Sequence, residues 1–156
     1  RKGSDAFIRL AKLMPSTRFV LAGLRGEALK RAKRDAEDAT NCEILPGPLS
    51  LYDDLIPLYE RASAYCQFSL SETFGVAVVE AMLCGALPIV FPNGALPEIV
   101  GAAGKIVESI EEASHAISES FSLSISHRES IARYAARFSL DKREMALRQV
   151  LSSLRS

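Results

Sequence analysis

The sequence predicts an α/β fold in which a parallel β-sheet carries helices on both faces. Short apolar runs, of the kind that form buried strands, alternate along the chain with longer segments of helical periodicity. Glycine or proline follows several of these runs, and no internal repeat interrupts the alternation. Parallel sheets of this kind bind ligands at the carboxyl ends of their strands, so we expect the functional residues at that edge.

The elements can be placed in order along the chain. The expected strands are 18–22, 42–45, 62–68, 87–91 and 104–107. The expected helices are 5–14, 26–38, 51–61, 76–84, a short one before Gly101, 109–123, 129–138 and 141–154. Ser4 and Ser50 are the predicted N-caps of the first and third helices, and Gly85 is placed to end helix 76–84.

For two helices the sequence predicts which residues face the core. In helix 76–84 we expect the inward residues to be Val76, Val79 and Leu83. In helix 109–123 we expect them to be Ile110, Ala113, Ile117 and Phe121. His115 and His127 belong to the late helices, and we expect both on the surface.

Length and composition indicate one ordinary globular domain. We expect residues 1–156 to form it, with an α/β core at 1–123 and C-terminal helices at 127–156. Lys plus Arg and Asp plus Glu each total 19, so no basic surface favours a nucleic-acid partner. No apolar run is long enough to span a bilayer, and the chain opens without a signal-peptide pattern.

The cysteine pattern favours free thiols. Cys42, Cys66 and Cys84 are odd in number and lack C-x-x-C spacing, which argues against a disulfide framework and against a zinc site. Cys66 and Cys84 fall in apolar elements, where we expect buried thiols. We therefore expect no metal and a cytoplasmic location.

The stretch 69–101 carries the predicted chemistry. The loop from Glu72 to Gly75 precedes helix 76–84, and free N–H groups at a helix N-terminus favour a phosphate. Gly75 would let a ligand approach the backbone closely. The carboxylates of Glu72 and Glu80 could accept hydrogen bonds from hydroxyl groups on either side. A nucleotide-sugar, with a diphosphate between two hydroxyl-bearing rings, would use all three features.

These residues also carry a family resemblance. The segment Glu72-Thr-Phe-Gly-Val-Ala-Val-Val-Glu80-Ala-Met-Leu-Cys-Gly-Ala-Leu-Pro-Ile-Val resembles the E-x7-E segment of retaining GT-B glycosyltransferases of sequence family four. Phe68 is a departure, because the family commonly has proline there. An alternative interpretation is that Glu72 and Glu80 simply lie on a solvated helix face. That would explain the two glutamates alone, but it would not explain why the whole segment around them matches the family pattern position by position.

The resemblance implies a Rossmann-like C-terminal half of a GT-B enzyme. Its first strand would precede Lys2 and is expected to be missing, as is the N-terminal acceptor domain. Lys2 would contact the donor diphosphate, Glu72 would orient the sugar and Glu80 would bind the ribose, with Lys2 and Glu72 as the catalytic residues. The implied donor-binding residues are Lys2, Gly3, Leu49, Glu72, Thr73, Phe74, Gly75, Val76 and Glu80.

The implied reaction transfers a hexose from a UDP-, GDP- or ADP-sugar to a saccharide or lipid-linked acceptor, as in polysaccharide biosynthesis. No cofactor or metal is expected, and the fragment alone should be inactive. The missing N-terminal domain would be the protein partner of this domain. Any peripheral contact with the inner face of a membrane would be made by that missing domain. A non-catalytic nucleotide-sugar-binding domain and a sugar-nucleotide epimerase of the same architecture remain alternatives. A dehydrogenase is disfavoured, because residues 23–26 lack the G-x-G-x-x-G spacing.

Overall fold

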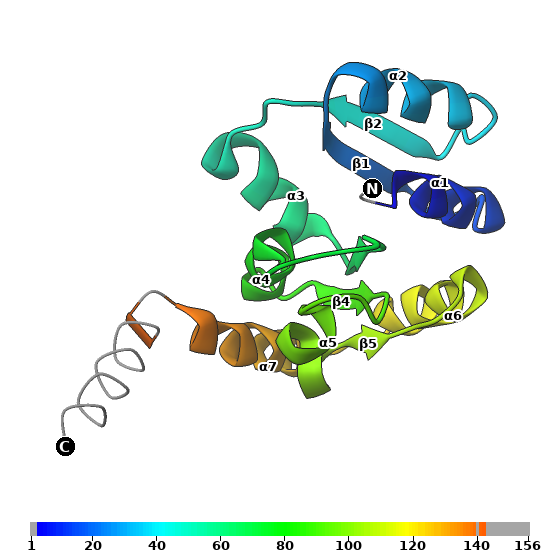
Figure 1. Ribbon diagram of the computed structural model, residues 1–156. Helices are drawn as coiled ribbons and strands as arrows, with labels where there is room; N and C mark the ends of the chain where they lie inside the picture. The colour runs from blue at the N-terminus through cyan, green and yellow to red at the C-terminus, as the bar shows by residue number, and fades with distance from the viewer. Residues whose placement is uncertain (1–2, 140, 143–156) are drawn as a thin grey trace.

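The fold is a layered α/β arrangement with parallel strands between two groups of helices (Figure 1). The computed structural model describes residues 3–139 and 141–142. Its strands are β1 (Phe19–Leu24), β2 (Cys42–Pro46), β3 (Ala64–Gln67), β4 (Leu87–Val90) and β5 (Lys105–Ile106). They form two parallel sheets, one of β1 and β2 and one in the order β3-β4-β5. The predicted α/β class is therefore confirmed, with the sheet divided in two.

The helices cover both faces of these sheets. They are α1 (Ser4–Leu13), α2 (Gly26–Asp35), α3 (Ile56–Arg61, after a π-helical turn at Leu51–Leu55), α4 (Val76–Leu83), α5 (Leu96–Val100), α6 (Ile110–Ser120) and α7 (Ile125–Ala135). Short 3₁₀ turns follow α5 at Gly101–Ala103 and α7 at Ala136–Phe138. Helix α1 packs against α2, α6 and β1, whereas α4 packs against α3, α7, β3 and β4.

The core centres on β4. All four of its residues are buried, as expected for a parallel strand that is covered on both faces. The largest fully buried side chains around it include Leu10 from α1, Met82 from α4 and Leu96 from α5. Helices from the start and from the middle of the described chain therefore pack around the same strand.

Three local predictions were wrong. Ser4 is the first residue of α1 and not its N-cap, because Gly3 precedes it in the left-handed conformation with φ 70°. Helix α7 begins at Ile125, since the Ser124 side chain caps it by accepting from the His127 N–H. Cys84 is a half-buried free thiol and not a buried one, whereas the Cys66 thiol is shielded from solvent although the residue as a whole is half-buried. The predicted helix 141–154 falls almost wholly outside the described residues.

The apolar faces were also partly misassigned. Val76 and Leu83 of α4 are 59% and 49% exposed, whereas the buried residues are Val78, Val79, Ala81 and Met82. Helix α4 is apolar almost all round, so its periodicity could not show which side faces the core. Phe121 follows the end of α6 and is 57% exposed, whereas Ile110, Ala113 and Ile117 are buried as predicted.

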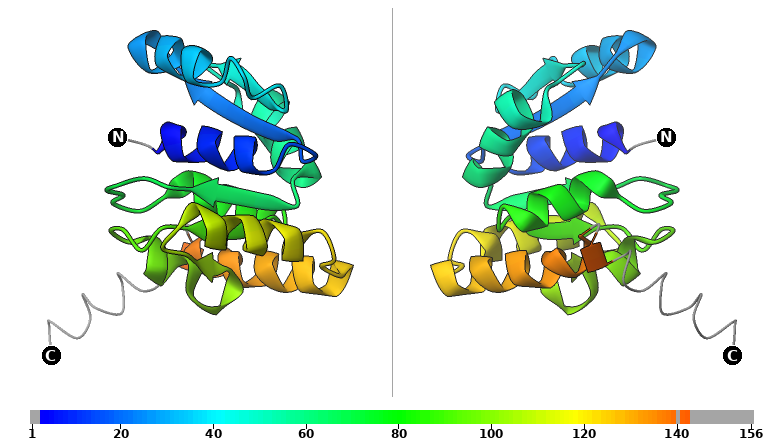
Figure 2. Two further views of the ribbon diagram at one scale, coloured as in Figure 1. Left: turned by 90° about the vertical axis from the view of Figure 1, so that its right-hand side faces the viewer. Right: turned by 90° about the vertical axis from the view of Figure 1, so that its left-hand side faces the viewer.

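A gap separates the two sheets. Within the described residues β1 pairs only with β2, and β3 pairs only with β4. The edges of β1 and β3 that face each other are therefore unpaired, and the two strands lie apart in both views of Figure 2. An elongated cavity of about 1140 Å³ is lined by all residues of both strands. Alternate residues of a strand point their backbone N–H and C=O groups to opposite edges of that strand. About half of the backbone N–H and C=O groups of β1 and β3 therefore face the cavity.

A strand ahead of Lys2, which the family resemblance implies, would lead into α1 beside this gap. Helix α1 starts beside the carboxyl end of β3, and a Cβ on Gly3 would overlap the backbone carbonyl of Phe68. A segment that entered α1 from this cavity would run parallel to β1 and β3. This βαβ arrangement is the usual one for parallel sheets.

Candidate functional site

The mouth of the cavity at the carboxyl ends of the strands brings the predicted site residues together. Its lining includes Gly3 from the start of α1, Leu49 from the loop after β2, the loop 72–76 after β3, and Glu80 from α4. Lys2 lies outside the described residues, so its position stays a prediction. Every other residue predicted for the donor site lines this one cavity.

Helix α4 points its N-terminus at this cavity. Its N-cap is Gly75, in the left-handed conformation with φ 72°, and no described side chain caps the helix. The first N–H groups of a helix have no partner within it, so here they are available to a ligand. Helices α6 and α7, whose N-termini lie outside the cavity, are instead capped by Ser109 and Ser124.

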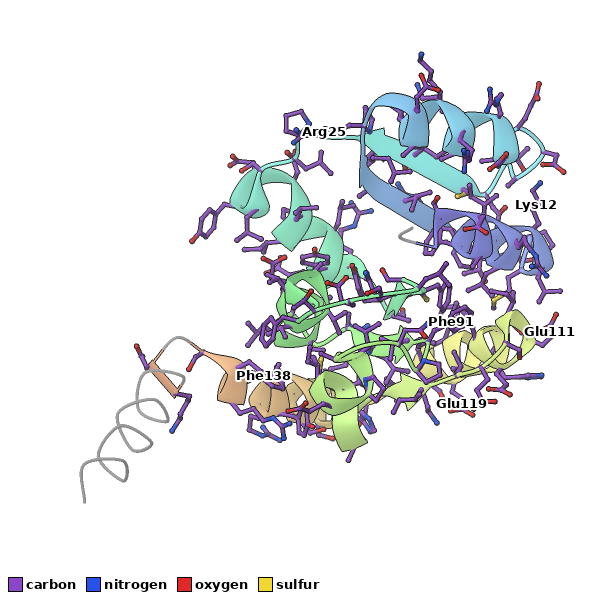
Figure 3. The ribbon with its side chains drawn as sticks, in the orientation of Figure 1. Lys12, Arg25, Phe91, Glu111, Glu119 and Phe138 are labelled. Atoms are coloured by element: carbon purple, nitrogen blue, oxygen red, sulfur yellow. The ribbon has the colours of Figure 1, made fainter. Side chains whose placement is uncertain are left out.

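The starts of α1 and α2 share this property. Gly3 and Arg25 are their N-cap positions, neither helix has a side-chain cap among the described residues, and both positions line the cavity. Figure 3 shows Arg25 at the start of α2, near the beginning of the loop that follows β2. A Cβ on Gly47 in that loop would lie 3.1 Å from Arg25 Nε. The cavity mouth therefore combines three uncapped helix starts with a guanidinium group.

The two carboxylates of the motif come from the loop before α4 and from α4 itself. Glu72 and Glu80 are both half-buried, and both line the same cavity. Glu72 Oε2 accepts a hydrogen bond from Gln67 Nε2 at 3.2 Å, and Glu80 Oε2 accepts from the Tyr59 hydroxyl at 3.4 Å. Each carboxylate thus has a partner at one oxygen, which orients it.

The loop after β4 holds the loop that carries Glu72. The Ala95 N–H donates to the Glu72 carbonyl at 3.0 Å, and Asn93 Nδ2 donates to the Ser69 carbonyl at 3.1 Å. On the other side, the Phe74 ring meets Phe138 edge-on, with 5.9 Å between centroids. Phe138, labelled in Figure 3, belongs to the turn that follows α7. Contacts from two distant segments therefore fix this loop.

Sequence reasoning missed the polar residues beneath the carboxylates. The Tyr65 hydroxyl donates to Gln67 Oε1 at 2.9 Å, and Gln67 Nε2 also donates to Ser69 Oγ at 2.7 Å. Burial, with a smaller contribution from Glu80, raises the pKa of Tyr59, and burial raises the pKa of Tyr65. Both phenols therefore remain donors. A glutamine inside an apolar strand was the signal that could have identified this group.

The loop after β2, which includes the predicted donor-binding residue Leu49, also lines the mouth of the cavity. Its Gly47–Pro48 peptide is cis, and the Gly47 N–H donates to the Leu24 carbonyl at the end of β1. Ser50 caps the following turn by accepting from the Asp53 N–H at 3.3 Å, as predicted. These contacts place Leu49 at the cavity.

Two further findings concern metals and membranes. Within residues 3–139 and 141–142, no three His, Cys, Asp or Glu side chains cluster closely enough to hold a metal ion. None of the helices in that part of the chain has the length and apolarity needed to span a membrane.

Parallel strands, helix N-termini at their carboxyl edge and a ligand-sized cavity there define a Rossmann-like α/β domain. The chain belongs to the family of glycosyl transferases group 1, whose sequence profile matches residues 1–138. The sequence expectation of a glycosyltransferase family is thereby confirmed.

Curated relatives match over part of the chain. The serotype-specific mannosyltransferase WbdA of Escherichia coli is 33% identical over 109 residues, which cover 65% of this chain and 13% of WbdA. The D-inositol 3-phosphate glycosyltransferase of Mycolicibacterium gilvum is 31% identical over 119 residues, which cover 70% of this chain and 26% of that protein. The matched segment is thus a small part of each relative.

Solved structures confirm the GT-B type of fold. The chain matches Alr3699/HepE of Anabaena, solved in complex with UDP, with a TM-score of 0.80 and 22% identity, over 97% of this chain and 45% of that one. A glycosyltransferase from Rickettsia africae matches with a TM-score of 0.77 and 21% identity, over 97% and 43% of the two chains.

Proposed function

We propose that this domain binds the donor of a retaining glycosyltransferase of the E-x7-E type and that the donor is a nucleotide-diphosphate sugar. The observation that carries the proposal is the uncapped N-terminus of α4, which opens into a cavity that Glu72 and Glu80 both line. The solved structures of HepE with UDP and with UDP-glucose support a donor of this class.

The geometry suggests how such a donor would bind. The diphosphate would meet the N–H groups at the start of α4, where the helix dipole favours negative charge. The same groups would stabilise the charge that grows on the diphosphate as the sugar leaves, which is the electrostatic contribution expected at a leaving phosphate. Lys2 would add a positive charge, and no metal would be needed.

The carboxylates would recognise the two ends of the donor. Glu72 would accept hydrogen bonds from the sugar hydroxyls and orient the anomeric carbon. Glu80 would accept from the ribose hydroxyls, and the loop around Leu49 would face the base. The acceptor would bind to a second domain, so that transfer requires both. A division of the work between two domains agrees with the comparison, because this chain covers 43% and 45% of the two matched chains.

A thermal-shift experiment tests the proposal. UDP-glucose, GDP-mannose and ADP-glucose would be added separately to the wild-type protein and to Glu80→Ala. One of the donors should raise the Tm of the wild type and raise it less in the variant, because bound ligand stabilises the folded state by mass action. Glu98→Ala is a matched control, since Glu98 is exposed on α5 and does not line the cavity.

Failure of all three donors to raise the wild-type Tm would contradict the proposal. A response without transfer by the complete two-domain protein would favour a non-catalytic nucleotide-sugar-binding domain instead.

A further inference from the structure

Gln67 is an unusual residue for its place in the fold. It is the last residue of β3, a strand whose other members are Ala64, Tyr65 and Cys66, and its amide group is half-buried. A buried amide is costly unless its donors and acceptor are paired. Here both ends are paired, with three side chains at hydrogen-bond distance.

The partners determine which way the amide faces. Glu72 Oε2, at 3.2 Å, is a carboxylate oxygen that accepts, so the amide nitrogen of Gln67 must lie on that side. The amide oxygen then faces Tyr65, whose hydroxyl donates to it at 2.9 Å. The direction of donation therefore runs from Tyr65 through Gln67 to Glu72.

A second contact holds Tyr65 itself. Its ring meets the Tyr59 ring edge-on, with 5.7 Å between centroids and an interplanar angle of 78°. The Tyr59 hydroxyl in turn donates to Glu80 Oε2. One set of side chains from α3 and β3 therefore contacts both carboxylates of the motif.

We propose that Gln67, oriented by Tyr65, is the positioning residue for Glu72 and fixes its Oε2 so that Oε1 faces the donor sugar. This inference rests on the proposed function. If the Glu72 carboxylate were free to rotate, it would lose that freedom when the sugar binds. The lost conformational entropy would weaken binding. The hydrogen bond from Gln67 holds the Glu72 carboxylate in place before the sugar binds, so less ordering is needed on binding.

The test compares nucleotide with nucleotide-sugar affinity in the full-length protein. The probes are the pairs UDP and UDP-glucose, GDP and GDP-mannose, and ADP and ADP-glucose, measured by calorimetry. Gln67→Met keeps the length of the side chain and removes both polar groups. It should leave nucleotide affinity unchanged and weaken nucleotide-sugar affinity roughly tenfold, the effect typical of losing a hydrogen bond to a charged group. Tyr65→Phe should produce a smaller change of the same kind.

A double-mutant cycle separates positioning from a general structural role. In a Glu72→Ala background, Gln67→Met should cause no further loss of nucleotide-sugar affinity, because the residue it positions is gone. Tyr52→Phe is the control for Tyr65→Phe, since Tyr52 is exposed and does not line the cavity.

Three results would overturn the inference while leaving the proposed function intact. They are full nucleotide-sugar affinity in Gln67→Met, an equal loss for nucleotide and nucleotide-sugar, and a loss that persists when Glu72 is absent. If the wild type binds none of these six probes, the proposed function itself fails, and the inference fails with it.

Discussion

Gly94 lies directly against the backbone of Glu72. A Cβ on Gly94 would overlap the Glu72 carbonyl oxygen, and the neighbouring Ala95 N–H donates to that same oxygen. The loop after β4 can therefore approach the motif loop only because residue 94 has no side chain. The position of Glu72 depends on a residue more than twenty places further along the sequence.

Gly94→Ala should damage both stability and the site. The variant would combine left-handed strain at φ 59° with a backbone overlap that no side-chain rotation can relieve. We expect it to lower the free energy of unfolding by about 1 kcal/mol or more beyond Gly26→Ala, measured by urea denaturation. Gly26 has φ 53° and nothing within 4 Å of its Cβ position, so it reports the strain alone. Equal losses in the two variants would show that the contact with Glu72 is unimportant.

Substitutions of Glu80 and Glu72 should have different effects on ligand binding. If Glu80 contacts the ribose, Glu80→Ala weakens the binding of nucleotide and nucleotide-sugar alike. If Glu72 contacts the sugar, Glu72→Ala weakens only the nucleotide-sugar. We expect roughly tenfold losses in calorimetry, since each variant removes a charged hydrogen-bond acceptor. The same pattern of losses in both variants would refute the assignment of the carboxylates to opposite ends of the donor.

The gap between β1 and β3 should be filled by a parallel strand. Phe19 donates its N–H to Asn41, so Leu21 also faces β2 while Val20 and Ala22 face the gap. In a longer version of the protein that has a strand ahead of Arg1, amide exchange at Val20 and Ala22 should become slower. The amide of Leu21, which already pairs with β2, is the internal control.

Unchanged exchange at Val20 and Ala22, with Leu21 protected as before, would mean that no strand enters the gap. The exposed ring of Phe121, which lines the far end of this cavity, should become shielded in the same extended chain.

Stability should fall at alkaline pH. Burial raises the pKa of the Cys66 thiol from 9.0 to about 12, and it also raises the pKa of Tyr59 and Tyr65 above 10.0. In this window the unfolded chain has released these protons while the folded chain still holds them, so rising pH favours unfolding. The free energy of unfolding should therefore be highest below pH 9 and decline between pH 9 and 12.

Urea denaturation at a series of pH values would measure this decline. Cys66→Ala should make it shallower, because the folded and unfolded states would then differ by one titrating group fewer. A free energy of unfolding that stays level from pH 9 to 12 would contradict the burial of these groups.

The sequence was informative where each element depends on its own residues. Strands β2 and β4 were predicted within a residue or two, because apolar runs between turn residues specify buried strands. Gly85 ends α4 as expected, with φ 79° just after the last helical turn. The carboxylates and the loop that precedes α4 were likewise found from one continuous segment.

The sequence was less informative where contacts between distant residues decide the outcome. Pairing of Gln67 with Tyr65 and Glu72 requires β3 to present its polar side chains at the cavity, and no local pattern specifies this. Val76 is apolar yet exposed, because the strands and helices around α4 leave its first turn at the cavity mouth. The separation of β1 from β3 likewise depends on strand pairing and not on either strand alone.

The central claim is that the start of α4 binds the donor diphosphate. The most direct test records backbone amide chemical shifts while UDP or GDP is added to the isotopically labelled protein. The account predicts that the largest shift changes fall on Gly75, Val76 and Ala77, with little change at Glu112, because its N–H already donates to the Ser109 side chain that caps α6. Saturable binding whose largest shift changes lie away from the start of α4 would contradict it.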